Sequence, residues 1–231
     1  SYWVKRYGPD NTTGNQQNIF VAGAGTYVFW CFSGDFDAQF TGGAFVDSRL
    51  QTNAVYRDPS GWYHHVIRID STQATTTNRV RLYVNGVEPT YSSQTVQTDL
   101  AQNEDVTNYN ASGVVQAYMG LAGAAHGTVG SDIQLAEIVF NDGQSYGPDS
   151  YGETKNGVWI PKDPSGLTFG NNGYYLKFES SSDLGNDSSG NNNDFTVTGG
   201  LSAHDQMLDS PTFNSDSNGG NFATYNPLSP T

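Results

Sequence analysis

Short apolar stretches alternate with polar breaks along the chain, and the clearest pattern spans residues 62–86. Its first stretch, Trp62–Asp70, is followed after a polar loop by Arg79–Val84. In the second stretch every other position is aliphatic: Val80, Leu82 and Val84. A period of two is typical of a half-buried β-strand, and the pair Asn85–Gly86 is a strong turn signal. The pattern predicts two antiparallel strands.

Similar stretches recur at short intervals, with Gly-rich or Asn-rich breaks between most of them. They predict strands at Tyr2–Tyr7, Asn18–Ala22, Thr26–Ser33, Ala38–Phe40, Ala44–Asp47, Leu50–Tyr56, Trp62–Asp70, Arg79–Val84, Val114–Leu121, Ile133–Asn141, Gly173–Phe178 and Asn193–Thr198. No segment shows a convincing period of 3.6, and one short helical turn is expected at Pro148–Gly152. Many short strands without intervening helices predict an all-β chain, an antiparallel β-sandwich.

The domain organisation follows from where the aliphatic residues stop. Residues 1–198 are expected to form the sandwich, with strands in 157–198 completing it. Residues 199–231 contain few aliphatics and many Ser, Asn, Gly and Pro. Such a segment cannot build its own core. We expect a loop-rich extension that lies on the sandwich, pairs with a neighbour or serves as a linker or assembly arm.

Composition narrows the classes of partner. The net charge is −13 with only 10 Lys and Arg, which argues against a nucleic-acid surface. No apolar run approaches the ~18 residues of a membrane span, so no membrane insertion is expected. Aromatic residues make up 13% of the chain, enough bulk to fill a core between two sheets. Cys31 is the single cysteine, so stability is expected from packing or assembly rather than from an internal disulfide.

Two adjacent histidines, His64 and His65, are the most chemically suggestive pair. Successive side chains on a strand point to opposite faces, so the two rings cannot chelate one metal from that strand alone. We expect both to be structural.

Calcium is the cofactor that the acidic residues suggest. Asp183, Asp187 and Asp194 lie in one Asn- and Asp-rich segment, and oxygen ligands at close spacing suit calcium. The segment lacks the bidentate Glu and the flanking helices of an EF-hand. Asp and Asn with Gly and Ser are also the usual residues of hydrogen-bonded turns. Both interpretations stay open.

Catalysis is not expected. A retaining glycosidase needs two carboxylates ~5–5.5 Å apart, and the usual signature is two acids on one face of a strand. Glu137 has no acid at position 135 or 139. Aromatic residues near loops are instead candidates for stacking on sugar rings. The selected candidates are Tyr109, Tyr146 and Trp159.

A longer ordered set of motifs resembles a known family. It comprises Trp3–Arg6, Arg57–His64, Asn78–Gly86, Leu135–Gln144, Tyr151–Thr154, Gly157–Lys162, Gly173–Phe178, Leu184–Asn193 and Asp209–Thr212. The set is similar to a laminin-G or concanavalin A-like lectin module found in virion proteins of tailed phages, notably those of cyanobacteria and marine bacteria. The resemblance covers nearly the whole chain.

The resemblance implies a non-enzymatic structural protein on the virion surface: a tail fibre, a head fibre or a capsid decoration. Its lectin-like sandwich would serve virion assembly, host attachment, or both. The implied partners are other virion proteins or copies of the chain itself, in an oligomer, and host-surface polysaccharide. The alternative is a carbohydrate-binding module of a secreted adhesin or a glycan-active enzyme.

Overall fold

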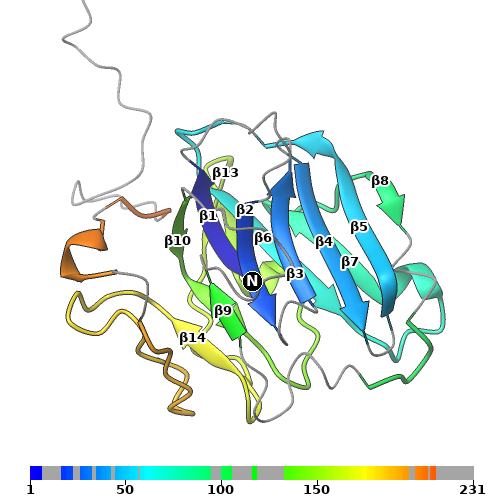
Figure 1. Ribbon diagram of the computed structural model, residues 1–231. Coiled ribbons are helices and arrows are strands. Elements are labelled where there is room, and N and C mark those ends of the chain that lie inside the picture. Colours follow the sequence, from blue (N-terminus) through cyan, green and yellow to red (C-terminus); the bar gives the residue numbers. More distant parts are fainter. Residues whose placement is uncertain are drawn as a thin grey trace, which may run out of the picture.

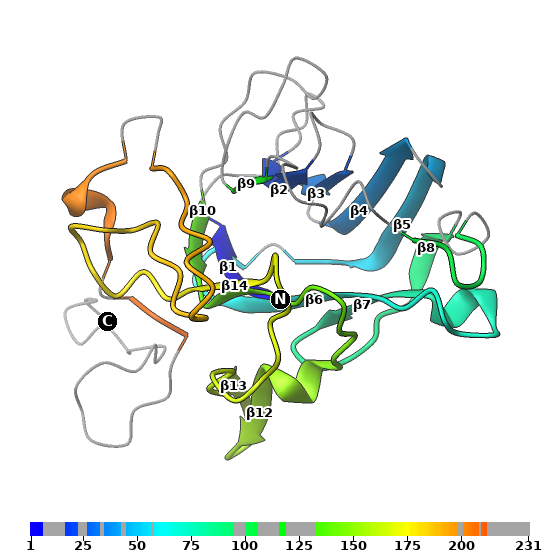
Figure 2. The same ribbon diagram turned by 90° about the horizontal axis from the view of Figure 1, so that it is seen from below.

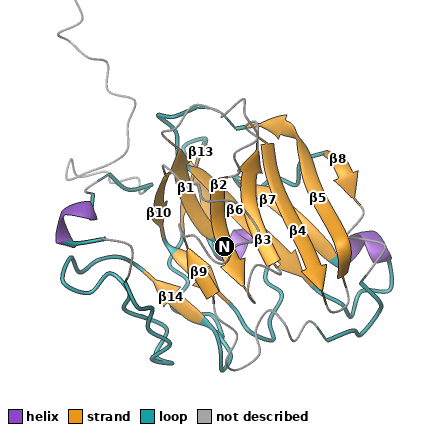
Figure 3. Cartoon of the chain, in the orientation of Figure 1, coloured by secondary structure: helices purple, strands orange, loops and turns teal. Residues whose placement is uncertain are grey.

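A computed structural model shows how the predicted strands assemble. It describes residues 1–6, 17–22, 27–32, 35–42, 45–56, 58–94, 100–105, 116–118, 133–197, 201–207 and 209–211. These residues form antiparallel strands, joined by loops and accompanied by three short 3₁₀ helices (Figure 3). The prediction of an all-β chain is confirmed.

The strands belong to two larger sheets and two small ones (Figure 1). The larger sheets have the strand orders β10-β1-β6-β7 and β8-β5-β4-β3-β2-β9, and the small ones are β11-β14 and β12-β13. The strands are β1 Tyr2–Arg6, β2 Gln17–Ala22, β3 Tyr27–Phe32, β4 Asp35–Gly42, β5 Phe45–Val55, β6 Tyr63–Ile69, β7 Val80–Val84, β8 Tyr91–Gln94, β9 Gln116–Tyr118, β10 Ile133–Ala136, β11 Ile138–Phe140, β12 Gly152–Lys155, β13 Val158–Pro161 and β14 Tyr174–Leu176. The 3₁₀ helices are η1 Thr76–Asn78, η2 Pro148–Ser150 and η3 Ala203–Asp205. The turn expected near Pro148 is therefore confirmed.

Strands β6 and β7 form the predicted pair. They are antiparallel, with His65 opposite Val84 and Ile69 opposite Val80. The following turn has positive φ at both Asn85 (50°) and Gly86 (81°), as the right-handed twist of a tight hairpin requires. It connects β7 to a backbone bridge at Val87.

Side chains from both larger sheets meet in one hydrophobic cluster. Phe20 and Leu50 come from the six-stranded sheet, and Val4 and Leu82 from the four-stranded one. Each is at most 2% exposed. Full burial of such a side chain stabilises the fold by roughly 1.5–3 kcal/mol. Figure 2 shows β4 and β5 on one side of this cluster and β6 and β7 on the other.

Two departures from the predicted strands come from polar residues that pair as strand residues. Ser48 and Arg49 suggest a break, but they pair with Phe40 and Gln39 of β4, so β5 is one strand where two were predicted. The polar strand β8 was not expected, and it pairs with β5 at the edge of the sheet. Backbone hydrogen bonds between strands do not require alternating apolar side chains, so polar residues can pair in this way. A strand at the edge of a sheet, such as β8, is also more open to solvent.

The predicted strand Ile133–Asn141 is divided at Glu137. This residue has φ of 49°, in the left-handed region that side chains other than glycine rarely adopt. Before it, β10 pairs with β1; after it, β11 pairs with β14. The turn at Glu137 thus redirects the chain from one sheet to another.

The predicted strand Asn193–Thr198 is wrong for residues 193–197, and Thr198 lies outside the described residues. The backbone N–H of Asn193 donates to a carboxylate oxygen of Asp187, and that of Phe195 donates to the carbonyl of Gly185. A side-chain acceptor in the loop replaces the strand ladder here.

The hairpin β12–β13, also not predicted as strands, docks on the rest of the fold through Trp159. The indole Nε1 donates to Nδ1 of His64 at 2.9 Å. Glycines at positions 86 and 152 leave room for the ring: a β-carbon on Gly152 would lie 2.5 Å from Trp159 Cε2, and one on Gly86 would lie 2.7 Å from Cη2. Both glycines are therefore required by close approach.

We predict that Gly152→Ala lowers the free energy of unfolding by about 1–3 kcal/mol, the usual cost of overpacking. The added methyl would overlap the indole of Trp159. Denaturant unfolding measures the change. Gly147→Ala is the matched control, because no atom lies within 4 Å of the place that its new methyl group would take and its φ is −83°. The control should change stability by less than about 0.5 kcal/mol, and equal effects in both variants would contradict the packing argument.

Candidate functional site

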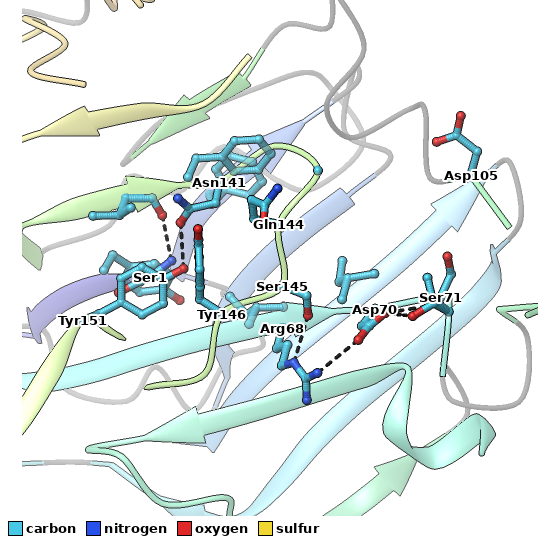
Figure 4. A pocket seen from close by; sticks show the side chains of 18 of the residues that line it. Ser1, Arg68, Asp70, Ser71, Asp105, Asn141, Gln144, Ser145, Tyr146 and Tyr151 are labelled. Carbon is cyan, nitrogen blue, oxygen red and sulfur yellow. Dashed lines mark hydrogen bonds and ion pairs between the residues drawn. The ribbon is translucent and has the colours of Figure 1, made fainter. Parts of the chain in front are cut away.

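A pocket of about 300 Å³ opens where β6 ends and where the chain leaves β11. Its inner wall is largely apolar, with Phe20, Ile67, Val139 and Phe140. Its outer wall is polar and carries the side chains of loop residues (Figure 4). An apolar floor with a few polar groups at the rim is the usual composition of a small-ligand site.

Two of the aromatic residues in the wall are Tyr146, which is half-buried, and Tyr151, which is 7% exposed. The Tyr151 hydroxyl donates to Oδ1 of Asn141 at 2.7 Å, and Nδ2 of Asn141 donates to the carbonyl of Thr168. The hydroxyl of Tyr146 accepts from the backbone N–H of Thr168. Both rings are therefore held in place before any ligand arrives.

An ion pair fixes the opposite wall. Arg68 donates to Oδ2 of Asp70 at 3.1 Å and to the hydroxyl of Ser145 at 2.9 Å. Asp70 also accepts from the N–H and hydroxyl of Thr72 and from the amide of Gln73. Burial acts to raise the pKa of Asp70, but the bonds from Thr72 and Gln73 and the charge of Arg68 outweigh it, so the pKa lies below its usual value. Asp70 is an ionised, fully hydrogen-bonded support.

Three other side chains at the rim have polar groups that remain available to a ligand. Gln144 and Asp105 are exposed, and among the described residues neither side chain has a hydrogen bond or ion pair. Glu104 uses Oε2 to accept from the N–H of Ala101, which leaves Oε1 for a ligand. An amide, two carboxylates and tyrosine rings in one pocket suit a ligand rich in hydroxyl groups. Carboxylates accept from O–H donors, and aromatic faces pack on C–H groups.

Of the three predicted sugar contacts, Tyr146 lies in the wall of this pocket. Trp159 lies elsewhere and is half-buried against His64, Gly86 and Gly152. Its contact with a glycan stays a prediction, and the structure gives its ring a packing role. Tyr109 lies outside the described residues. Sequence reasoning missed Asp70, Asp105 and Gln144 as pocket residues, since only folding brings residues 70, 105 and 144 together.

The two histidines have separate surroundings, as the alternation predicts. His64 is stacked on Trp3 and lies near Tyr151, whereas His65 lies against Tyr2. Burial lowers the pKa of both rings, to about 3 for His65. Both are neutral at physiological pH.

His64 also contacts a serine hydroxyl, but its tautomer is unsuited to activating it. Trp159 has only a donor, so Nδ1 of His64 must be the unprotonated acceptor and Nε2 carries the proton. Nε2 lies 2.8 Å from Oγ of Ser1 and therefore donates to it. A general base would need the reverse arrangement. This Ser–His contact is structural.

The segment from Asp183 to Asp194 is organised by Asp187. One carboxylate oxygen accepts from the N–H groups of Tyr175 and Ser189, and the other accepts from the Ser189 hydroxyl and the N–H of Asn193. Asp194 accepts from the N–H of Asp187 at 2.8 Å. A carboxylate has about four lone-pair positions, and those of Asp187 are occupied.

This geometry favours the hydrogen-bonded turn over the calcium loop. Asp183 is exposed, whereas Asp187 is 7% exposed. Among the residues that the structure describes, no three His, Cys, Asp or Glu side chains are grouped so that they could hold one metal ion.

The described part of the chain also has no helix long and apolar enough to cross a membrane.

Comparison with known proteins adds no functional assignment. No family model matches the chain, and no curated protein matches it. The function is therefore argued from the geometry of the pocket.

We predict that Asp187→Asn lowers the free energy of unfolding at pH 7 by about 1–3 kcal/mol. The NH2 group of the new asparagine would face N–H and O–H donors that now donate to the carboxylate. Although burial acts to raise it, hydrogen bonds to the carboxylate hold the pKa of Asp187 below its ordinary 3.8. The stabilisation is thus present above pH 3.8 and is lost as the pH falls through the lower folded pKa. Urea unfolding at pH 7 and at pH 2–3 measures both values.

Asp183→Asn is the control in the same segment and should change stability by less than about 0.5 kcal/mol. Addition of calcium to chelator-treated protein should leave the melting temperature unchanged. A rise of several degrees with calcium, lost in Asp187→Asn, would establish the calcium site instead.

Glu137 provides a second test of the electrostatics. Burial raises its pKa, against the opposing hydrogen bond from Tyr175 and the charge of Lys177. Its contribution to stability is therefore present below its ordinary pKa of 4.5 and is lost as the pH rises through the higher folded value. Glu137→Gln, which mimics the protonated acid, should be more stable than the parent at pH 8 and equally stable at pH 4. Thermal unfolding of both proteins from pH 4 to pH 8 measures the difference in stability. A difference that does not change with pH would contradict the argument.

Proposed function

We propose that the chain is a non-enzymatic, glycan-binding β-sandwich on the surface of a tailed-phage virion. The observation that carries the proposal is the pocket, which is lined by two fixed tyrosines and by unused amide and carboxylate groups. Its volume of about 300 Å³ lies at the lower end of the range for small-ligand sites, which suits a short stretch of a glycan.

The sandwich part of the proposal is supported by the shared core. The two larger sheets contribute to one hydrophobic cluster, and all their strand pairs are antiparallel. Two antiparallel sheets packed on one core are what a concanavalin-like module would have. On this proposal strands β13 and β14 complete residues 1–198 as one domain.

The extension offers a specific contact with this domain. Nζ of Lys5 donates to Oδ2 of Asp209 at 2.6 Å, and the indole of Trp62 donates to the other oxygen at 3.5 Å. The extension is thus anchored on its own chain at Asp209, and residues 212–231 lie outside the described part. In the proposed virion role, the domain edges and the remainder of the extension contact other copies or other virion proteins.

The three acidic residues of the pocket, Asp70, Glu104 and Asp105, keep glycan hydrolysis as the second candidate. A general acid at neutral pH needs a raised pKa. That of Asp70 is lowered, and its oxygens already accept bonds from the chain. Asp70 is therefore unsuited to the role of general acid. We propose binding without cleavage, which holds equally if the module belongs to an adhesin.

A glycan array tests the proposal, with Gln144→Ala as the pocket variant. Gln144 is exposed and forms no bond in the described structure, so its loss should not affect folding. We expect glycan binding by the parent chain and at least a tenfold loss of affinity in the variant, equivalent to about 1.4 kcal/mol. Gln94→Ala is the matched control, an exposed glutamine on β8 outside the pocket.

Absence of binding to every glycan would refute the proposal, and equal losses in the two variants would move the site elsewhere. Chromatography of the bound glycan after incubation separates the second candidate. Shortened products, lost in a Glu104→Gln variant, would make the pocket catalytic.

A further inference from the structure

The pocket has an uneven distribution of charge. Among its lining side chains Arg68 is the single cation, whereas Asp70, Glu104 and Asp105 are acids. The positive charge of Arg68 is already paired with Asp70 at 3.1 Å. With one cation and three acids, the lining side chains carry a formal net charge of −2.

The hydrogen-bonding groups left for a ligand include both acceptors and donors, and the two carboxylates are the acceptors that carry charge. The side-chain groups left for a ligand include the carboxylate of Asp105, one oxygen of Glu104, the amide of Gln144, the hydroxyl of Ser71 and Nη1 of Arg68. The carboxylates accept hydrogen bonds and donate none. A ligand hydroxyl or ammonium group satisfies them, whereas a ligand carboxylate or sulfate would be repelled. The Nε and Nη2 groups of Arg68 are occupied by Ser145 and Asp70.

We propose that the pocket selects glycans that lack acidic groups, favouring amino sugars over neutral sugars and excluding uronates and sulfated sugars. This inference rests on the proposed glycan binding and adds the class of sugar. The pocket supplies the site itself through its tyrosines and Gln144, and the two acids supply the selection. Repulsion between charges of the same sign on a protein and on an unwanted ligand is a common means of specificity.

Three soluble oligosaccharides of equal length test the selection: a glucosamine oligomer, an N-acetylglucosamine oligomer and a galacturonate oligomer. Isothermal titration with the full chain at pH 6 should rank them in that order, with at least tenfold between the first and the last. The difference should shrink at high salt, because exposed charges are screened over about 10 Å at 0.1 M.

The double variant Asp105→Asn, Glu104→Gln removes both charges and keeps the shapes. It should lose most of the tenfold preference, and the neutral oligomer should lose less affinity than the glucosamine oligomer does. The control is Glu153→Gln with Asp183→Asn, which changes the net charge equally at exposed positions outside the pocket. The control should keep the parent's ranking.

The outcomes separate this inference from the proposed function. If the neutral oligomer binds in the pocket but the galacturonate oligomer binds equally well, the selection is wrong and glycan binding stands. If the control loses the ranking as the double variant does, the overall charge of −13 is responsible rather than the pocket. If no oligosaccharide binds, the proposed function fails and the inference fails with it.

Discussion

The neutral state of His64 is the constraint on which much of the arrangement depends. Its Nδ1 must stay unprotonated to accept the indole N–H of Trp159, because a protonated ring would place two donors face to face. This bond joins β6 to the hairpin β12–β13, and the ring also lies near Tyr151, which lines the pocket. Burial lowers the pKa of His64 well below its usual value, so the required state is also the stable one. One tautomer thus links the four-stranded sheet, a separate hairpin and one wall of the candidate site.

Local periodicity predicts what is local and fails where the partner is distant. The alternation in β6 correctly separates His64 from His65, since strand geometry requires nothing beyond neighbouring residues. The alternation does not predict that Trp159 is the partner of His64, because Trp159 lies 95 residues further along the chain. The break at Glu137 is equally invisible, because a positive φ is rarely adopted by glutamate and no glycine or asparagine marks it.

Four aspartates of the chain support its own turns. Asp58, Asp70, Asp163 and Asp187 each accept from the N–H of the Ser or Thr two residues later, at 2.8–3.2 Å. The pKa of each lies below its ordinary value, with hydrogen bonds from that residue among the causes. At these four positions the motif Asp-x-Ser/Thr marks a turn support. From sequence alone such an aspartate looks the same as a metal ligand, because only the bonds formed on folding distinguish them.

The same distinction identifies the side chains that are free to act. Asp70 and Asn141 bond to their neighbours and hold the pocket walls, whereas Asp105 and Gln144 extend from the loops without such bonds among the described residues. A ligand that meets fixed walls requires little ordering of the protein, so most of its contacts contribute to affinity. Binding residues concentrate on loops held by a rigid scaffold for this reason. The strands of this chain thus determine where a ligand can sit, and the few unbonded loop side chains determine which ligand it is.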